Sequence, residues 1–492
     1  MSRTRRRVKT RREFLKQSAM TAGMLPLFGG GNLSFAGVKS PLDPSAITKL
    51  RRSFSGHLVV PGDPDYDTAR VPSMNPEVDR FPAIVAQCAN EDDVLRCIDF
   101  SHQQKLEIAV RSGNQSFLGW GTCNNGIVVD LSRMKSVKVD AVQGTVHAGT
   151  GNTAQEILAA TAPYSLAPIL GQCGGVGAGL ALGGGLGWLS GQFGATCDNL
   201  MSARLITADG HTLTADSTTN PDLFWAIRGG GGNFGIATSF QYQLHPVKEF
   251  LAGSFVYPAT RARALLRFFR EYMSSAPDDL QPDCWLTNHP NGRFMIRLVH
   301  TGKLDDGERL VDMFRSFTAP EQERMKRMPF SEVYRWSDAD VEFAPYPFQS
   351  LKGTYIEQLS DEAINLIFER FVQPPPSCAV TFDFGHYMHG EVCRVAPDAR
   401  AFGLRKPDAI HLVVILQWKN RADMLPCLAW QNKTLELLQK YSNGHIYANY
   451  MSVTGATTAS RTYGNNLDRL RQLKEKYDPE NFFHLNQNIL PK

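Results

Sequence analysis

The sequence predicts an α+β protein, and two observations lead to that prediction. The chain has 492 residues, of which 42% are hydrophobic, and this is enough to fill more than one core. Helix-like and strand-like hydrophobic patterns alternate along the chain, with no repeat and no heptad run. No uninterrupted apolar stretch is long enough to cross a bilayer, so the sequence predicts no membrane span.

The first 36 residues have the order of an export leader. Residues 10–16, TRREFLK, match the twin-arginine motif. A mildly apolar region follows at 19–28, and Ser-Phe-Ala at 34–36 fits a cleavage site. A basic arm that binds nucleic acid has no need of this order. We therefore predict a twin-arginine signal peptide over 1–36, the twin-arginine export machinery as a partner, and a periplasmic or secreted mature protein.

The leader also accounts for the positive charge of the chain. It holds eight basic residues and one acid, a contribution of +7 to a total of +4, which leaves −3 on the rest. Nothing else in the composition indicates a nucleic-acid partner. The nine cysteines all follow the leader and show no zinc-type spacing, so no metal site is predicted. Folding in a reducing compartment before export predicts few disulfides.

Helix and strand patterns follow one another in the mature part. Before residue 250 a helix is followed by a strand, a polar glycine turn and a second strand. After residue 250, two helix patterns alternate with two strand patterns. The predicted elements are, in that order, 92–102, 106–110, 111–116, 127–131, 262–273, 294–300, 308–317 and 411–417.

Glycine is most concentrated between residues 171 and 199, GQCGGVGAGLALGGGLGWLSGQFGATCDN. Glycine costs backbone entropy in helices and strands, so this density indicates that another group approaches the backbone closely. The segment lacks the Lys-Ser/Thr ending of a P-loop and the spacing of GxGxxG, which disfavours nucleotide hydrolysis and a Rossmann turn. Its leucines and tryptophan disfavour a solvated loop.

Three further motifs complete a pattern. RSGNQS at 111–116 is a turn whose N–H groups, with Arg111 beside them, would form an anion nest. DLFWAIRGGGGNFG stands at 222–235, and a C-terminal pattern runs from Asn449 to Ile489. Together and in this order, the motifs resemble those of the berberine-bridge-enzyme-like branch of the vanillyl-alcohol oxidase superfamily of flavoproteins. The resemblance extends from about residue 50 to the C-terminus.

The resemblance implies a fold and a division of the chain. It implies a two-part PCMH-type FAD-binding domain and a substrate domain in which helices cover an antiparallel sheet. We expect the FAD-binding domain over 50–248, the substrate-binding domain over 249–430, and a berberine-bridge-like segment over 431–492 that returns to the FAD domain. The flavin ring is expected at the junction, where pockets usually form.

The resemblance also assigns FAD as the cofactor and places its binding residues in the glycine motifs and the C-terminal segment. These residues are Arg111, Ser112, Gly113, Asn114, Gln115, Ser116, Cys173, Gly174, Gly177, Gly179, Gly184, Gly185, Asn199, Gly235, Ile236 and Asn486.

Covalent attachment of the flavin is where this sequence departs from its relatives. Many of them link FAD through a histidine and a cysteine. Gln115 stands at the histidine position, and an amide is no nucleophile, so no histidyl link is expected. Cys173 stands at the cysteine position, although the spacing to the following glycines is one residue short. Two states are open for it: a flavin thioether, helped by backbone amides that lower the thiol pKa, or an unmodified thiol.

Oxidation of an alcohol requires a base, because the O–H proton must leave as hydride leaves the carbon. The resemblance assigns this role to Tyr450, in Tyr447-Ala-Asn-Tyr450, and makes Asp383 its supporting acid. Ser452 replaces the family's usual aspartate. His386 and His389 are alternative acid–base groups.

The sequence therefore predicts an FAD-dependent oxidase or dehydrogenase acting on an alcohol, sugar or phenolic or alkaloid-like small molecule. The alternative is a flavin-binding protein with little turnover, because loss of the histidyl link lowers the flavin potential. A binding module without flavin is disfavoured by the intact glycine motifs.

Overall fold

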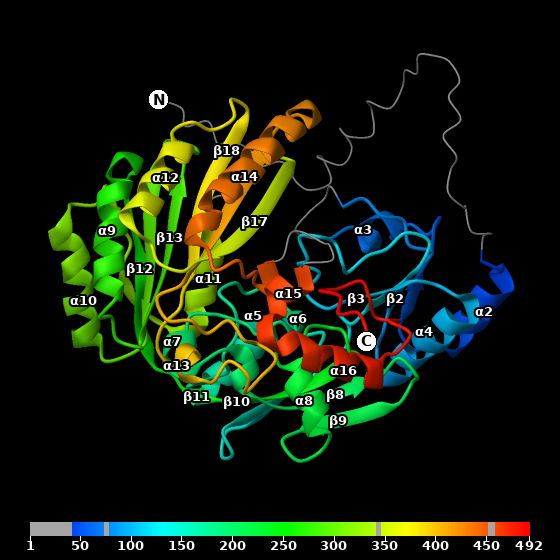
Figure 1. Cartoon of the computed structure of the whole chain (residues 1–492). Coiled ribbons are helices and arrows are strands. Elements are labelled where there is room, and N and C mark those ends of the chain that lie inside the picture. Colours follow the sequence, from blue (N-terminus) through cyan, green and yellow to red (C-terminus); the bar gives the residue numbers. More distant parts are fainter. Residues whose placement is uncertain (1–41, 73–77, 341–345, 451–457) are drawn as a thin grey trace, which may run out of the picture. The chain divides into compact units, whose positions relative to one another are not determined.

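The computed structural model describes residues 42–72, 78–340, 346–450 and 458–492 (Figure 1). The predicted leader and Ser452 lie outside these described residues. No helix within them is long and apolar enough to cross a membrane. Residues from Leu42 to Lys492 form one compact unit. Its three large hydrophobic cores are built mainly from different parts of the chain.

The first core lies against a four-stranded mixed sheet. Its elements are α2 (Pro44–Ser53), β1 (His57–Val59), α3 (Tyr66–Arg70), β2 (Ile84–Gln87), α4 (Glu91–Gln104), β3 (Ile108–Arg111) and β4 (Ile127–Asp130). The strand order is β1-β2-β4-β3, with β4 parallel to both β2 and β3. α4 connects β2 to β3 and begins after Asn90, whose side chain accepts a hydrogen bond from the Asp93 N–H.

The second sheet is antiparallel and has five strands in the order β5-β6-β10-β8-β9. Its strands are β5 (Val137–Asp140), β6 (Thr145–Gly149), β8 (Leu200–Ile206), β9 (Thr212–Asp216) and β10 (Ile236–Gln243). The glycine-rich segment connects β6 to β8 and holds two short helices, α6 (Gly179–Leu182) and α7 (Ser190–Phe193). The remaining elements of this part are α5 (Ala154–Thr161), β7 (Leu166–Ala167), α8 (Pro221–Ile227) and β11 (His245–Pro246).

An eight-stranded antiparallel sheet forms the middle of the chain. Its strands are β12 (Glu249–Pro258), β13 (Leu280–Thr287), β14 (Arg293–His300), β15 (Gln322–Glu323), β16 (Lys326–Pro329), β17 (Phe348–Ile356), β18 (Cys378–Tyr387) and β19 (Ile410–Trp418). The order is β15-β12-β14-β13-β18-β19-β17, and β16 also pairs with β12. Helices in this part are α9 (Ala262–Met273), α10 (Leu304–Phe317), α11 (Phe330–Asp340), α12 (Asp361–Phe371), α13 (Glu391–Arg394) and α14 (Met424–Leu438).

Successive side chains along these strands point to opposite faces of the large sheet, and the two faces differ in polarity. Cys284, Ile296 and Phe384 belong to a core closed by α9, α10, α12 and α14, which lie against the sheet in Figure 1. Their neighbours Asp283, Arg297 and Asp383 point to the other face. The predicted α+β class, with helices covering an antiparallel sheet, is confirmed.

The C-terminal segment packs on the part that precedes β12. It consists of α15 (Thr458–Tyr463), α16 (Leu467–Tyr477) and an extended tail, and α16 contacts α8. The Lys474 ammonium is fully buried, pairs with Asp478, and donates to the Asn233 and Phe483 carbonyl oxygens at 2.9 and 3.0 Å. This anchor fixes the tail that carries Asn486.

Candidate active site

One large cavity, of about 600 Å³, lies where the glycine-rich segments, the tail and the open face of the large sheet meet. This volume is in the range of sites that bury a cofactor or a drug-sized ligand. One end is lined by glycine backbone and the other by the side chains of β13, β14 and β18. The cavity therefore combines a backbone cradle with a wall of ionisable groups.

The two glycine segments cross at close range. A Cβ on Gly113 would lie 2.7 Å from the Gly177 nitrogen, and a Cβ on Gly177 would clash with Gly113 in return. The Ser112 hydroxyl bridges them, because it donates to the Thr150 carbonyl oxygen and accepts from the Ala178 N–H at 3.2 Å. Only glycine permits this crossing, which explains part of the glycine density.

Arg111 lies beside this crossing but is already paired. Its guanidinium donates to the Asp130 carboxylate at 2.7 and 3.0 Å and to the Ala69 carbonyl oxygen. The charge expected to help an anion nest is thus largely neutralised by Asp130. One nitrogen, Nη1, is buried and has no hydrogen-bond partner among the described residues.

Most of the predicted site residues line the cavity. They are Arg111, Ser112, Gly113, Asn114, Gln115, Ser116, Cys173, Gly177, Gly179, Gly235, Ile236, Asp383, Tyr450 and Asn486. Four others lie outside the lining that the structure describes and hold the surrounding loops. Gly174 donates to Asp338, Gly184 and Gly185 pack against Phe402 and Thr196, and Asn199 donates to the Phe193 and Ala195 carbonyl oxygens.

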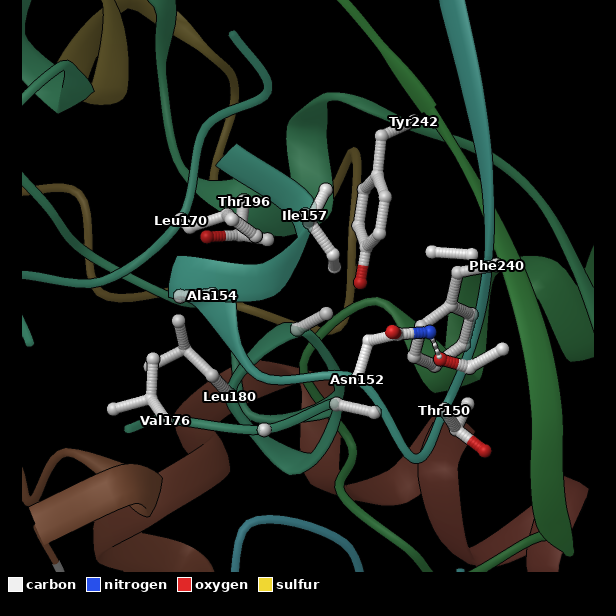
Figure 2. A pocket seen from close by; sticks show the side chains of 15 residues that line it. Thr150, Asn152, Ala154, Ile157, Leu170, Val176, Leu180, Thr196, Phe240 and Tyr242 are labelled. Atoms are coloured by element: carbon white, nitrogen blue, oxygen red, sulfur yellow. Dashed lines mark hydrogen bonds between the residues drawn. The ribbon is translucent and has the colours of Figure 1, made fainter. Parts of the chain in front are cut away.

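A second, much smaller cavity, drawn in Figure 2, has Gly177 and Ala178 of the glycine crossing in its lining. Its volume of about 10 Å³ admits about one water molecule. The Tyr242 hydroxyl points into it, and the Asn152 amide beside it donates to the Gly149 carbonyl oxygen at 2.9 Å. This cavity is too small for a substrate and belongs to the packing beneath the cradle.

The C-terminal tyrosines differ in their contacts. The Tyr447 hydroxyl accepts hydrogen bonds from the Gly185 and Leu186 N–H groups at 3.1 and 3.0 Å, so it fixes the glycine-rich segment. Tyr450 lies on Tyr447 with ring centroids 5.8 Å apart and lines the cavity. Burial raises the pKa of the Tyr450 phenol well above its ordinary value, and the charge of Asp383 raises it further.

The two candidate histidines, His386 and His389, differ in whether they line the cavity. His386 lines the cavity, and burial lowers its pKa to about 3, so its imidazole is neutral and only weakly basic at ordinary pH. His389 lies outside the described lining, where its ring packs close to Gly191 and contacts Tyr387. His389 as an acid–base group in this cavity is therefore not supported by its position.

Cys173 and Gln115 face the same part of the cavity. The Gln115 amide lies directly over Gly175, since a Cβ there would be 2.5 Å from Nε2. Cys173 is exposed to the cavity but surrounded by protein, and this burial raises its pKa to about 11. The expectation that backbone amides lower that pKa is wrong: burial raises it, and the negative charge of Asp338 raises it further.

The open face of the large sheet adds ionisable groups that the sequence analysis did not single out. Asp283 pairs with Arg297, and the Trp285 indole donates to the same carboxylate at 2.9 Å. Asp338 reaches the cavity from α11. The signal that could have found Asp283 and Arg297 is alternation within 280–287 and 293–300. Both residues lie between apolar residues that share the opposite face of their strands, such as Cys284 and Ile296.

The residues around the cradle fit FAD. Asn486 donates to the Gly232 and Phe483 carbonyl oxygens, and its buried Oδ1 has no partner among the described residues. Together with Arg111 Nη1, this gives one hydrogen-bond acceptor and one donor without partners among the described residues, both on residues that line the cavity. A flat, polar cofactor supplies groups for both and needs the space that side chains would occupy.

Of the nine cysteines, all within the described residues, Cys378 and Cys427 form a disulfide and the other seven are unpaired. This agrees with the expectation of few disulfides. No group of metal-ligating side chains is found among the described residues.

Comparison with known proteins identifies two domains. Residues 82–216 match the FAD binding domain model, and residues 446–490 match the berberine and berberine-like model. An FAD-linked oxidoreductase of Dictyostelium discoideum is 29% identical over 448 residues, which cover 90% of this chain and 97% of that protein. These matches confirm the expected resemblance.

Solved structures give the same result. The structure of 6-hydroxy-D-nicotine oxidase from Arthrobacter nicotinovorans has a TM-score of 0.82 and 25% identity, covering 89% of this chain and 98% of that one. Xylooligosaccharide oxidase from Myceliophthora thermophila shares the fold, with a TM-score of 0.80 and 20% identity over 91% and 99% of the two chains. The expected cofactor, FAD, and the expected fold are confirmed.

Proposed function

We propose that this chain, which resembles the berberine-bridge-enzyme-like FAD-linked oxidoreductases, oxidises a C–OH group of an alcohol, a sugar or a phenolic or alkaloid-like small molecule. One observation carries the proposal: Tyr450 and Asp383 line the same cavity as the glycine cradle. A proton acceptor and a cofactor site thus face one space, as alcohol oxidation requires. The oxidoreductase class itself follows from the family.

FAD would be held by the crossing at Gly113 and Gly177, by Arg111 Nη1 and by Asn486 Oδ1. Bound there, it supplies a hydride acceptor at N5 of its ring. Gln115 at the histidine position supports a cofactor without a histidyl link. The raised pKa of Cys173 keeps its thiol protonated at neutral pH, which supports an unlinked cofactor at that residue too.

The protein's own part in the reaction is to orient the substrate and to take its proton. Tyr450 is the acceptor of the hydroxyl proton, with its ring held by Tyr447. A buried phenol is a poor base by itself, so its neighbours must favour the phenolate at the moment of transfer. Asp383 is the proposed support, and it can serve only when protonated, because its negative charge raises the pKa of the Tyr450 phenol.

The test is anaerobic mixing of the purified yellow protein with a panel of sugars, primary and secondary alcohols, phenols and hydroxylated N-heterocycles. Loss of the visible flavin absorbance on mixing with a panel member is the expected result. Return of the absorbance on admission of oxygen identifies an oxidase, and its absence identifies a dehydrogenase. A flavin that no panel member bleaches supports the alternative, a flavin protein with little turnover.

We further propose that the mature protein acts in the periplasm or outside the cell, since residues 10–16 carry the twin-arginine motif. That route moves folded proteins, which suits an enzyme that acquires its cofactor before export.

A further inference from the structure

Three charged residues of the large sheet are brought together by strand register. β13 lies between β14 and β18. Asp283 on β13 is directly opposite Arg297 on β14, and Asp383 on β18 is directly opposite Trp285, two positions along β13 from Asp283. Asp283, Arg297 and Asp383 are therefore direct or diagonal neighbours on the face that lines the cavity.

The contacts within this cluster are close and almost free of solvent. Asp283, Arg297 and Asp383 are 1%, 2% and 6% exposed. Arg297 pairs with Oδ2 of Asp283. Asp383 is the diagonal cross-strand neighbour of Asp283, a position from which the two carboxyl groups interact. Oδ1 of Asp383 is buried and has no other partner among the described residues.

Two carboxyl groups can form a hydrogen bond only when one of them is protonated, because an ionised carboxylate is an acceptor alone. A charge count gives the same result. With both aspartates ionised, one buried arginine faces two buried charges, and one added proton makes the cluster neutral. Buried carboxylates that share a site behave in this way.

Among the described residues, no other group facing the cluster supplies a second cation. Tyr450 and Cys173 are uncharged, since burial raises both pKa values, and His386 and His411 are neutral, since burial lowers theirs. Asp338, on α11, adds a further acid. The other arginine of the described lining, Arg111, is paired with Asp130.

We propose that Asp283 and Asp383 hold one proton between them at neutral pH, with Arg297 balancing the remaining negative charge. Asp283 is thus a positioning residue that sets the ionisation of Asp383. Burial and the charge of Asp283 both raise the pKa of Asp383 well above its ordinary range, while Arg297 opposes the shift.

The consequence for catalysis rests on the proposed function. An ionised Asp383 raises the pKa of Tyr450 and so opposes the phenolate that proton transfer requires. A protonated Asp383 removes that repulsion and can donate a hydrogen bond into the cavity. Asp283 therefore favours transfer of the substrate proton to Tyr450 by acting through Asp383.

The proton can be observed without turnover. Infrared spectroscopy of the FAD-loaded protein at neutral pH detects the C=O stretch of a protonated carboxyl group, which shifts in D₂O. In Asp283→Asn, Asp383 ionises against Arg297 and the band is lost. In Asp383→Asn, Asp283 ionises against the same arginine and the band is lost again. The matched control is Asp338→Asn, in which the band remains.

Loss of one band in either single variant is the signature of a shared proton. A band that survives in Asp283→Asn would overturn the proposal, since Asp383 would then be protonated by burial alone. If Asp283→Asn does not fold, Asp283→Glu keeps the charge and moves the carboxyl by one methylene; its band must change frequency, and an unchanged band overturns the pair. Because this readout needs no substrate, it can succeed even where the proposed oxidation fails.

Discussion

Tyr447 and Tyr450 are three residues apart in the sequence, but their hydroxyl groups have different environments. Tyr447 is held by two backbone N–H groups of the glycine-rich segment, whereas Tyr450 opens to the cavity. Residue identity alone does not make this distinction, because both side chains are tyrosines in one short motif. Their hydrogen-bond partners do.

We predict that Tyr450→Phe slows anaerobic flavin reduction by a true substrate about 100- to 10,000-fold, the usual cost of removing a positioned base. The ring and its packing are kept, so the FAD content and the unfolding temperature should change little. Tyr355→Phe is a matched control, since that hydroxyl is buried, has no hydrogen-bond partner in the described residues and lies outside the described lining. Reduction of Tyr450→Phe at the unmodified rate would place the base elsewhere.

Cys173 gives a second residue-level prediction. Its pKa is raised from 9.0 to about 11, so the thiolate fraction near pH 8 is roughly 100-fold below that of an ordinary thiol. Alkylation of the flavin-free protein at this residue should be correspondingly slow and should accelerate until about pH 11. Peptide mass spectrometry after timed labelling measures the rate, with Cys173→Ser as the blank.

The raised pKa of Cys173 also predicts how the cofactor is attached. Acid precipitation of the loaded protein should release the yellow colour into the supernatant, because neither Gln115 nor a protonated Cys173 thiol attacks the flavin. A flavin mass on a peptide that contains Cys173 would contradict this result and favour the thioether.

At the scale of elements, the C-terminal segment depends on one buried ion pair. The Asp478 carboxylate accepts from Lys474 and from the Phe482 and Phe483 N–H groups, with no exposure of either charged side chain. The pair thus joins α16 to the tail that carries Asn486. An unpaired partner at this point would leave a charge buried in the core.

We predict that Lys474→Met lowers the free energy of unfolding by about 3–5 kcal/mol and weakens FAD retention, because it leaves Asp478 uncompensated. Lys476→Met, on the same helix, removes an exposed ion pair with Asp222 and should cost about 0–1 kcal/mol. Urea unfolding and gel filtration with flavin detection measure both effects. Equal losses in the two variants would show that the pair is no anchor.

Elements with a strong local pattern could be predicted from the sequence. The helix expected over 262–273 is α9 within the same limits, and the strand expected over 411–417 is β19, one residue longer at each end. These segments have a clear hydrophobic pattern, helical in the first and a continuous apolar run in the second, because both contribute to the helix-covered core. The glycine motifs were informative for a different reason, since their spacing follows from a required close approach.

The cluster of Asp283, Arg297 and Asp383 could not be predicted in the same way. Each residue is one polar position in an otherwise buried strand, and the contact depends on which strands are neighbours and in what register. Local pattern carries no information about pairing across 100 residues of sequence. The same limit applies to Asp338, which meets Cys173 only because α11 packs near the glycine-rich segment.

At the scale of the whole molecule, the FAD site is built from segments distant in sequence. The cradle comes from 111–116 and 171–179, the tail from the C-terminus and the reactive wall from the large sheet. A ligand that contacts all of them stabilises the folded state of each. Cofactor loading is therefore expected to be coupled to completion of the fold.

This coupling leads to a prediction about export. Replacing both Arg11 and Arg12 by lysine should retain the protein in the cytoplasm, still yellow and still active in extracts, because the motif is an address and no part of the site. Cell fractionation, with a flavin spectrum recorded on each fraction, measures this.

The Lys474→Met variant, with its intact leader, tests whether export also depends on FAD loading. If the route requires a completed fold, the exported fraction of Lys474→Met should fall in proportion to its loss of FAD, and periplasmic material of that variant should be fully loaded. Flavin-free protein in the periplasm would separate export from loading, and an unchanged periplasmic fraction in the twin-lysine variant would contradict the assignment of the leader.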